Sequence, residues 1–367
     1  MPEILSRASI LFKVDSRLRG NPHEPGLTKV DENWGYPELS VCGKIRGNRR
    51  IAMDVIFDRC CGIDVHKETL TACIMVGTGP RMRKEIKTYS TMTEELEKLR
   101  GWLKAEGITH IAMESTGVYW KPVYNILEED FSVMIANAKH IKHVPGRKTD
   151  VKDSEWICKL LRNGLIRGSF IPPRHIRNLR DLTRHRAKLN HLMTSEKNRL
   201  QKYLEDSNIK LASVASDIFG VSGRAMLKEL LGGNEDVEAI ADLAKGVLRN
   251  KKEALKKSCV GRVTEHHRMM IQFSLKHLEY METLRGAVQH QIDKVVRENN
   301  LQKNIELLDT IPGVHEEAAE VILAEIGTDM NTFPTEHHLA SWAGISPGNN
   351  ESAGKKKADR PARGTNG

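Results

Sequence analysis

Four acidic residues occupy positions from which carboxylates commonly bind metal ions. Asp64 and Glu114 each end an apolar run of strand type. Asp150 and Asp153 lie three positions apart, just before an amphipathic run that begins at Trp156, so the spacing predicts that they project from one face of a helix's first turn. Carboxylate oxygens are the hard ligands that Mg²⁺ and Mn²⁺ prefer. Convergence of the four would create a site for divalent cations, which can stabilise the attacking and leaving oxygens of a phosphodiester.

A structural role explains each of these acids when it is considered alone. Acids in the first turn of a helix interact favourably with the positive end of its dipole and often cap it. The metal-site interpretation depends on the ordered placement of all four acids, at two strand ends and then on one helix. Clustered carboxylates repel one another unless a cation lies between them.

The elements that would position these acids follow an α/β pattern. Residues 60–76 predict two strands joined by a polar turn at 66–68, and residues 93–107 predict a helix. Residues 108–115 and 131–138 predict two further strands, and the helix that carries Asp150 and Asp153 comes next. An early hairpin followed by strand–helix alternation predicts an α/β layer architecture.

The second half of the chain has helical periodicity. Residues 175–204 and 269–296 each carry an apolar stripe, which predicts a helical hairpin or a coiled coil formed within one chain or between chains. The basic face of the first helix includes Arg177, Arg180 and Arg184, for which solvation and nucleic-acid contact are both open interpretations.

A helix, an Ile-Pro-Gly-Val turn at 311–314 and a second helix resemble a helix-hairpin-helix motif, in which Gly313 lets backbone N–H groups approach a phosphate. The same turn also occurs where two helices simply pack together. A Gly-rich tail follows, and its lysines include Lys355 and Lys356.

The composition favours a polyanionic partner. The chain has 367 residues and a formal net charge of +9, which suits nucleic acid. No segment approaches the roughly 20 apolar residues of a membrane span, and the N-terminus lacks the features of a signal peptide. The six cysteines show no metal-binding spacing. We therefore expect an intracellular protein with reduced thiols and no membrane partner.

Several ordered motifs resemble the insertion sequence 110 transposase family, which comprises DEDD recombinases related to the Piv DNA invertases. The resemblance runs from about residue 59 to the C-terminus and rests on GIDVHK, MESTGVYW, NAKHIKHVPGRKTDVKDSEWICKLLRNGL, IPGV, LAEIG, LASWAGISPG and ESAGK. It implies an α/β RNase H/RuvC-like domain whose metal-binding acids correspond to Asp64, Glu114, Asp150 and Asp153. It also implies a nucleophilic serine that falls on Ser352, although a serine in a Gly-rich loop is commonly only a polar loop residue.

This resemblance and the patterns together predict four regions. Residues 1–57 form an extension, with Met53 as an alternative translation start, and residues 58–172 form the RuvC-like DEDD domain. Residues 173–300 form the long helical, coiled-coil segment, and residues 301–367 form a small, mainly helical C-terminal domain. The family pattern continues into a closing helix beyond Ser352, so we expect a truncated C-terminus.

The expected function is DNA transposition or recombination that depends on Mg²⁺ or Mn²⁺. The expected partners are DNA at the element ends and target, a guide RNA from the element, and further copies of the chain in a dimer or tetramer. Lys148, Arg177, Arg180, Arg184, Gly313, Lys355 and Lys356 are the predicted nucleic-acid contacts, in the nucleoid-associated cytoplasm of a prokaryotic cell. A metal-dependent junction-type nuclease and an inactive nucleic-acid-binding relic are the alternatives.

Overall fold

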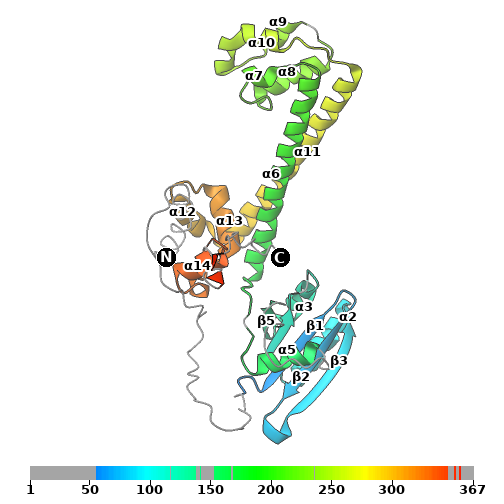
Figure 1. Ribbon diagram of the computed structural model, residues 1–367, viewed down its shortest axis with the longest axis vertical. Coiled ribbons are helices and arrows are strands. Elements are labelled where there is room, and N and C mark those ends of the chain that lie inside the picture. The colour runs from blue at the N-terminus through cyan, green and yellow to red at the C-terminus, as the bar shows by residue number, and fades with distance from the viewer. Residues whose placement is uncertain are drawn as a thin grey trace. The chain divides into compact units, whose positions relative to one another are not determined.

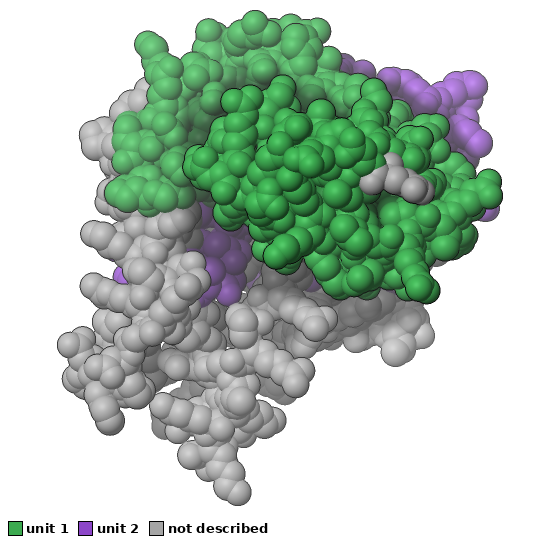
Figure 2. Space-filling view, turned by 90° about the horizontal axis from the view of Figure 1, so that it is seen from above, with its two compact units in different colours: residues 1–6, 172–329 green, residues 7–171, 330–367 purple. Residues whose placement is uncertain are grey.

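The computed structural model describes residues 55–115, 117–137, 141, 153–166, 168–234, 236–345, 351–352 and 355–356. The chain divides into two compact units, and each is treated separately below (Figure 2). Residues 172–329 form a helical unit, and the described residues within 55–171 and 330–356 form a sheet-containing unit. Met53 and most of the predicted extension lie outside the described residues, as do Lys148 and Asp150.

The sheet has five strands in the order β3-β2-β1-β4-β5 (Figure 1). β1 (Arg59–Val65) pairs antiparallel with β2 (Thr69–Val76), which pairs antiparallel with β3 (Arg83–Ser90). On its other side β1 pairs parallel with β4 (His110–Glu114), which pairs parallel with β5 (Ser132–Ala136). This mixed sheet confirms the predicted α/β architecture.

The edge strand β3 is absent from the predicted elements. Its sequence, RKEIKTYS, carries charged residues at half of its positions, and none of its residues is buried. Charged side chains on an edge strand discourage pairing with other chains, but they also remove the apolar alternation by which strands are recognised.

Helices cover both faces of the sheet. α2 (Thr93–Ala105) and α3 (Trp120–Leu127) pack their apolar residues against one face. In α2, which agrees with the helix predicted at residues 93–107, the buried residues Leu96, Leu99 and Leu103 recur at helical spacing and form its buried side. α5 (Asp153–Arg162) packs against the opposite face.

α5 approaches β1 very closely at Gly62. A Cβ atom at this position would lie 2.2 Å from the backbone nitrogen of Cys158 and 2.4 Å from the carbonyl oxygen of Ser154. Only a residue without a side chain permits this contact, so Gly62 determines how closely the helix lies to the strand.

The helical unit is built on two long helices that lie side by side, α6 (Arg174–Asp206) and α11 (Glu265–Glu298) (Figure 1). Arg186 of α6 hydrogen-bonds to Gln289 of α11, and further along α6 Asp206 contacts His267. Residue numbers therefore rise along one helix as they fall along the other, which makes the pair antiparallel. None of the described helices is both long and apolar enough to cross a membrane.

Short helices connect the far ends of the long pair. They enclose a core with the ends of α6 and α11, around Leu227, Ile240 and Leu255. The sequence analysis does not predict them, because helices of one to three turns show too few apolar repeats to establish a period. They are α7 (Leu211–Val214), α8 (Val221–Leu231), α9 (Val237–Asp242), the 3₁₀ helix η2 (Gly246–Lys251) and α10 (Lys252–Ser258).

At the other end of the pair, α12 (Gln302–Asp309) and α13 (Glu316–Ile326) pack together, and α13 packs on α6. A buried ion pair joins Arg186 of α6 to Glu320 of α13, with exposed side-chain fractions of 3% and 2%. Gln289 donates a hydrogen bond to the same carboxylate, so three helices share one polar contact.

The C-terminal part of the sheet-containing unit begins with η3 (Met330–Thr332) and α14 (Glu336–Trp342). Phe170 packs edge-on against Phe333 and Trp342, with ring centroids 5.5 and 6.3 Å apart. This aromatic cluster joins two segments of the unit that are far apart in the sequence. Two short strands follow, β6 (Glu351–Ser352) and β7 (Lys355–Lys356), paired antiparallel.

Candidate active site

Asp64 and Glu114 occupy equivalent positions on neighbouring parallel strands. The ladder pairs Ile63 of β1 with Met113 of β4, so the next residue on each strand is one of the two acids. Residues in register on parallel strands project to the same face of a sheet. The strands therefore place both carboxylates on one face, at their C-terminal ends, as the sequence predicts.

That face is the one covered by α5. Gly62 lies two residues before Asp64, and side chains alternate along a strand, so positions 62 and 64 share a face. Gly62 is also where the backbone of α5 touches β1. The Asp64 side chain is 21% exposed, which leaves it accessible beneath the end of the helix.

The direction of α5 brings its first residue toward the same end of β1. The carbonyl of Arg162, at the end of α5, accepts a hydrogen bond from the N–H of Phe57, before β1 begins. The carbonyl of Ser154, at the start of α5, lies at Gly62. Since the helix runs antiparallel to the strand, Asp153 is located toward the strand end that carries Asp64.

The donor chemistry suits a hard divalent cation, although the described residues provide only part of the predicted set. In the part of the chain that the structure describes, no group of three or more histidine, cysteine, aspartate or glutamate residues is arranged to hold a metal ion. Asp150 lies outside that part. Asp64 and Glu114 supply two carboxylates on one face, and Asp153 is an exposed third acid at the start of α5.

His66 is a neighbour of Asp64 that the sequence analysis does not include among the site residues. Its Nε2 atom lies 3.2 Å from Oδ2 of Asp64, and its side chain is 67% exposed. His66 begins the turn between β1 and β2, which is closed by a hydrogen bond from the N–H of His66 to the carbonyl of Thr69. The motif GIDVHK contained the signal: a titratable side chain two residues after the strand-end acid.

All three predicted nucleic-acid contacts on α6, Arg177, Arg180 and Arg184, have partners within the helical unit. Arg180 donates hydrogen bonds to the carbonyls of Ala324 and Glu325, at 3.0 and 2.8 Å. Arg184 forms a bidentate pair with the carboxylate of Glu325, at 2.7 and 3.0 Å. These arginines bind the C-terminal end of α13, so any contact with a phosphate would compete with these bonds. Arg177 donates to the carbonyl of Pro172 at 3.0 Å.

The remaining predicted residues lie in the C-terminal segments. Gly313, between α12 and α13, has a φ of +88°, and nothing lies within 4 Å of the place where a Cβ would stand. Ser352 of β6 pairs through its backbone with Lys355 of β7, and Lys356 pairs with Glu351.

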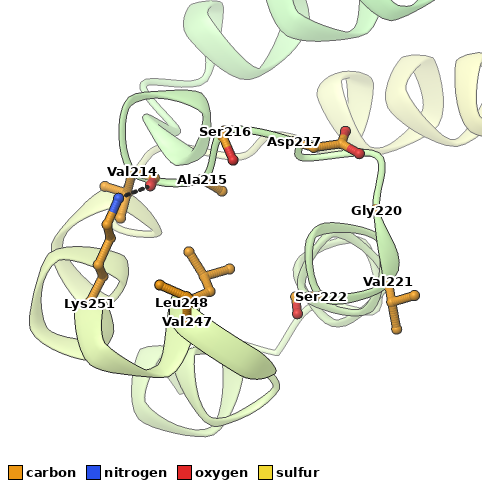
Figure 3. A pocket seen from close by; sticks show the side chains of 10 residues that line it. All are labelled: Val214, Ala215, Ser216, Asp217, Gly220, Val221, Ser222, Val247, Leu248 and Lys251. Atoms are coloured by element: carbon orange, nitrogen blue, oxygen red, sulfur yellow. Dashed lines mark hydrogen bonds between the residues drawn. The ribbon is translucent and has the colours of Figure 1, made fainter.

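A pocket in the helical unit contains none of the predicted site residues (Figure 3). Asp217, Ser222 and Lys251 are among the polar residues that line it. The Nζ atom of Lys251 donates to the carbonyl of Val214 at 3.2 Å, so this ammonium group already has a partner.

Comparisons with known proteins identify the class of this chain. A transposase family model for DEDD transposases of the IS110 type matches residues 61–209, and a model described as the transposase IS116/IS110/IS902 family matches residues 305–366. A search of curated proteins finds no match. Among solved structures, Thermus thermophilus RuvC is similar over 31% of this chain and 84% of its own, with 14% sequence identity and a TM-score of 0.22.

Both matched regions therefore identify the protein as a transposase. The two models describe different parts of one kind of protein and match this chain in the expected order, one over the acids of β1 and β4 and one over Ser352. The chain belongs to the insertion sequence 110 transposase family, as the motifs in the sequence predict.

Proposed function

We propose that this transposase is a DEDD-type DNA recombinase that cleaves and exchanges strands with a metal site and a serine nucleophile. The observation that carries the proposal is the in-register placement of Asp64 and Glu114 on parallel strands beneath α5, in a chain of this family. The mixed sheet, three antiparallel strands followed by two parallel strands, supports an RNase H/RuvC-like domain around these acids.

Asp64, Glu114 and Asp153, together with Asp150, would hold Mg²⁺ or Mn²⁺. When bound, such an ion neutralises charge on a phosphodiester and favours displacement at phosphorus. The chain's own part is to hold the carboxylates in fixed positions: two sit on strands at the centre of a sheet, and Gly62 lets the helix of the third lie directly over β1. Groups on regular elements keep their positions better than groups on loops.

Ser352 would act as the nucleophile. Its Oγ attacks the phosphorus, the new P–O bond leaves the phosphate joined to the 5′ side of the break, and the 3′ oxygen departs with a proton as a hydroxyl group. A phosphoserine ester conserves the energy of the broken bond for the later joining step. Lys355 and Lys356, paired with the Ser352 strand, would neutralise the phosphate.

The partners in this proposal are the DNA of the element ends and target, a guide RNA transcribed from the element, and further copies of the chain. The net charge of +9 supports a polyanionic partner. Omitting the RNA from the reaction below tests guidance, because a guided enzyme loses cleavage of the matching target without it.

A protein–DNA adduct assay tests the nucleophile. Purified protein, DNA spanning an element end, RNA from its flank and Mg²⁺ are mixed and resolved under denaturing conditions. The wild-type protein should form an adduct that resists denaturant, and Ser352→Ala should not. Ser341→Ala is the matched control, since Ser341 is an exposed serine of α14 in the same unit and its loss should leave the adduct unchanged.

The same gel separates the alternatives. An adduct that persists in Ser352→Ala would exclude Ser352 as the nucleophile. Cleaved DNA without any adduct would indicate a metal-dependent junction-type nuclease that uses Asp64, Glu114, Asp150 and Asp153 and needs no serine. Binding without products would indicate a nucleic-acid-binding protein that lacks the chemistry.

A further inference from the structure

Two buried cysteines touch at the contact between β1 and α5. Cys60 of β1 and Cys158 of α5 are both 0% exposed, and their Sγ atoms lie 3.7 Å apart. They are separated by 98 positions in the sequence. The proposed recombination chemistry uses neither thiol.

Each sulfur also approaches the other residue's backbone. Sγ of Cys158 lies 3.6 Å from the carbonyl oxygen of Cys60, and Sγ of Cys60 lies 3.9 Å from that of Cys158. The pair is therefore held by reciprocal contacts between strand and helix rather than by a single chance approach of two side chains.

The two thiols differ in acidity. A hydrogen bond from Cys158 lowers the pKa of Cys60 against the opposing effect of burial, and the nearby Arg162 guanidinium lowers it further. The hydrogen bonds of Cys158 with Cys60 and Cys73, together with burial, raise the pKa of Cys158 well above its usual value. The Cys60 thiol therefore loses its proton more readily than the Cys158 thiol, so of the two touching sulfurs Cys60 is the one that would attack a peroxide first and Cys158 the one that would resolve the product.

We propose that Cys60 and Cys158 form an oxidisable dithiol, a modification site at which a hydroperoxide such as H₂O₂ generates a disulfide between β1 and α5. The proposal is independent of the recombinase function and rests on the contact of the two sulfurs.

The reaction balances in two steps. The Cys60 thiolate attacks one oxygen of H₂O₂, the O–O bond breaks, and hydroxide leaves to take up a proton as water, which converts Cys60 to a sulfenic acid. The Cys158 sulfur then attacks the Cys60 sulfur, the S–O bond breaks, and the departing hydroxide takes the Cys158 proton as a second water. The two sulfurs lose two electrons in total, and the peroxide gains them.

The rate of disulfide formation depends on how easily peroxide reaches the two sulfurs and on how far the sulfurs must move. The sulfurs must close to about 2.05 Å, and at Gly62 the backbones of β1 and α5 are already in tight contact, so side-chain rotation must supply the movement. Peroxide is close to water in size, but both sulfurs are covered, so local opening of α5 has to precede the reaction. We therefore expect oxidation that is slower than that of an exposed thiol.

Peptide mapping tests the proposal on the full-length protein. The reduced protein is treated with H₂O₂, its remaining thiols are alkylated under denaturing conditions, and the digest is analysed by mass spectrometry. A peptide that joins Cys60 to Cys158, lighter by two hydrogens than its parts and cleaved by dithiothreitol, is the expected product. Finding both cysteines alkylated, or Cys158 joined to Cys73 instead, would overturn the proposal.

Variants separate the roles of the two sulfurs. Cys158→Ala should abolish the link and leave Cys60 as a sulfenic acid that dimedone traps, whereas Cys60→Ala should abolish both products. Cys259→Ala is the matched control, because Cys259 is a buried free cysteine of the helical unit and its removal should leave the link intact. The mapping of the wild-type protein decides the question even if a variant fails to fold.

Discussion

At the scale of the residue, Gly62 determines whether the helix that carries Asp153 can lie against the strand that carries Asp64. A methyl group at this position would overlap backbone atoms of α5, which cannot rotate away as a flexible side chain would. Overpacking of this kind typically lowers the free energy of unfolding by about 1–3 kcal/mol. Because the added methyl group would meet two backbone atoms, we expect the loss in Gly62→Ala to be at or above the upper end of that range. The free energy of unfolding in urea should fall accordingly, and metal-dependent DNA cleavage should fall with it.

Gly101→Ala is the control for that substitution. Gly101 lies within α2, and nothing stands within 4 Å of its missing Cβ. Alanine in a helix interior is favoured over glycine by about 0.5–1 kcal/mol, so this variant should be as stable as the wild type or more stable. Equal stability of the two variants would show that the close approach at Gly62 does not limit the fold.

Glu155 makes the stability of the sheet-containing unit depend on pH in the acidic range. Its carboxylate lies 2.6 Å from Lys159 and 3.0 Å from Lys84, and the hydrogen bond from Lys159 is the main reason that its pKa lies below the usual 4.5. A carboxyl whose pKa is lower in the folded state stabilises the fold above its unfolded pKa. That contribution is lost as the pH falls through the lower, folded-state pKa.

Glu155→Gln should therefore lower the free energy of unfolding at pH 7 and reduce the further loss of stability below about pH 4.5. Thermal melts across this range provide the measurement. Glu94→Gln is the control, because the Glu94 side chain is 81% exposed and its ion pair with Lys98 should contribute little. If Glu155→Gln lost stability below pH 4.5 as steeply as the wild type, Glu155 would not be the source of this pH dependence.

At the scale of the element, the buried pair Arg186–Glu320 fixes α13 on α6. Removing one partner of a buried ion pair leaves an uncompensated charge and costs about 3–5 kcal/mol. Arg186→Met should therefore destabilise the helical unit by about this amount, and the added change Glu320→Leu should restore part of the loss. Chemical denaturation followed by circular dichroism measures both; a double variant no more stable than the single one would contradict the argument.

The elements also show what the sequence could and could not predict. Strands β1, β2, β4 and β5 are apolar runs between polar turns, and α6 and α11 carry long apolar stripes. These patterns were sufficient to predict the six elements from the sequence. β3 could not be predicted because its charged residues interrupt the apolar alternation of a strand, and α7 to α10 could not be predicted because they are too short to show a helical period. The convergence of Asp64 and Glu114 was predictable because parallel strands bring their carboxyl ends together. Partners that depend on tertiary packing, such as Glu325 for Arg184, leave no spacing in the sequence.

At the scale of the whole molecule, the helical unit has a core of its own, formed by α6 to α11. Such a core is what independent folding requires. Residues 172–329 expressed alone should be predominantly helical and unfold cooperatively on heating, as circular dichroism would show. A gradual loss of helix without a transition would indicate that this unit depends on the rest of the chain.

Binding of DNA should be strongly salt-dependent. Each phosphate neutralised by a basic side chain contributes about −0.9 to the slope of log affinity against log salt, so six contacts would weaken binding about a thousandfold between 50 and 200 mM. Fluorescence anisotropy with end-bearing DNA measures the slope. Asp64→Asn should keep the slope while losing cleavage, since it removes a proposed metal ligand and no basic group; a flat response in the wild type would argue against electrostatic binding.

The sheet-containing unit is discontinuous in the sequence, with residues 172–329 inserted between its two parts. Ribosomes add about 5–20 residues per second and domains tend to fold as they emerge, so the sheet that holds Asp64 and Glu114 exists for many seconds before Phe333 and Trp342 are made to pack against Phe170. Ser352 is translated later still. The order of synthesis therefore delays completion of this unit until its last segment has been made, so under the proposed mechanism a nascent chain would lack its serine nucleophile.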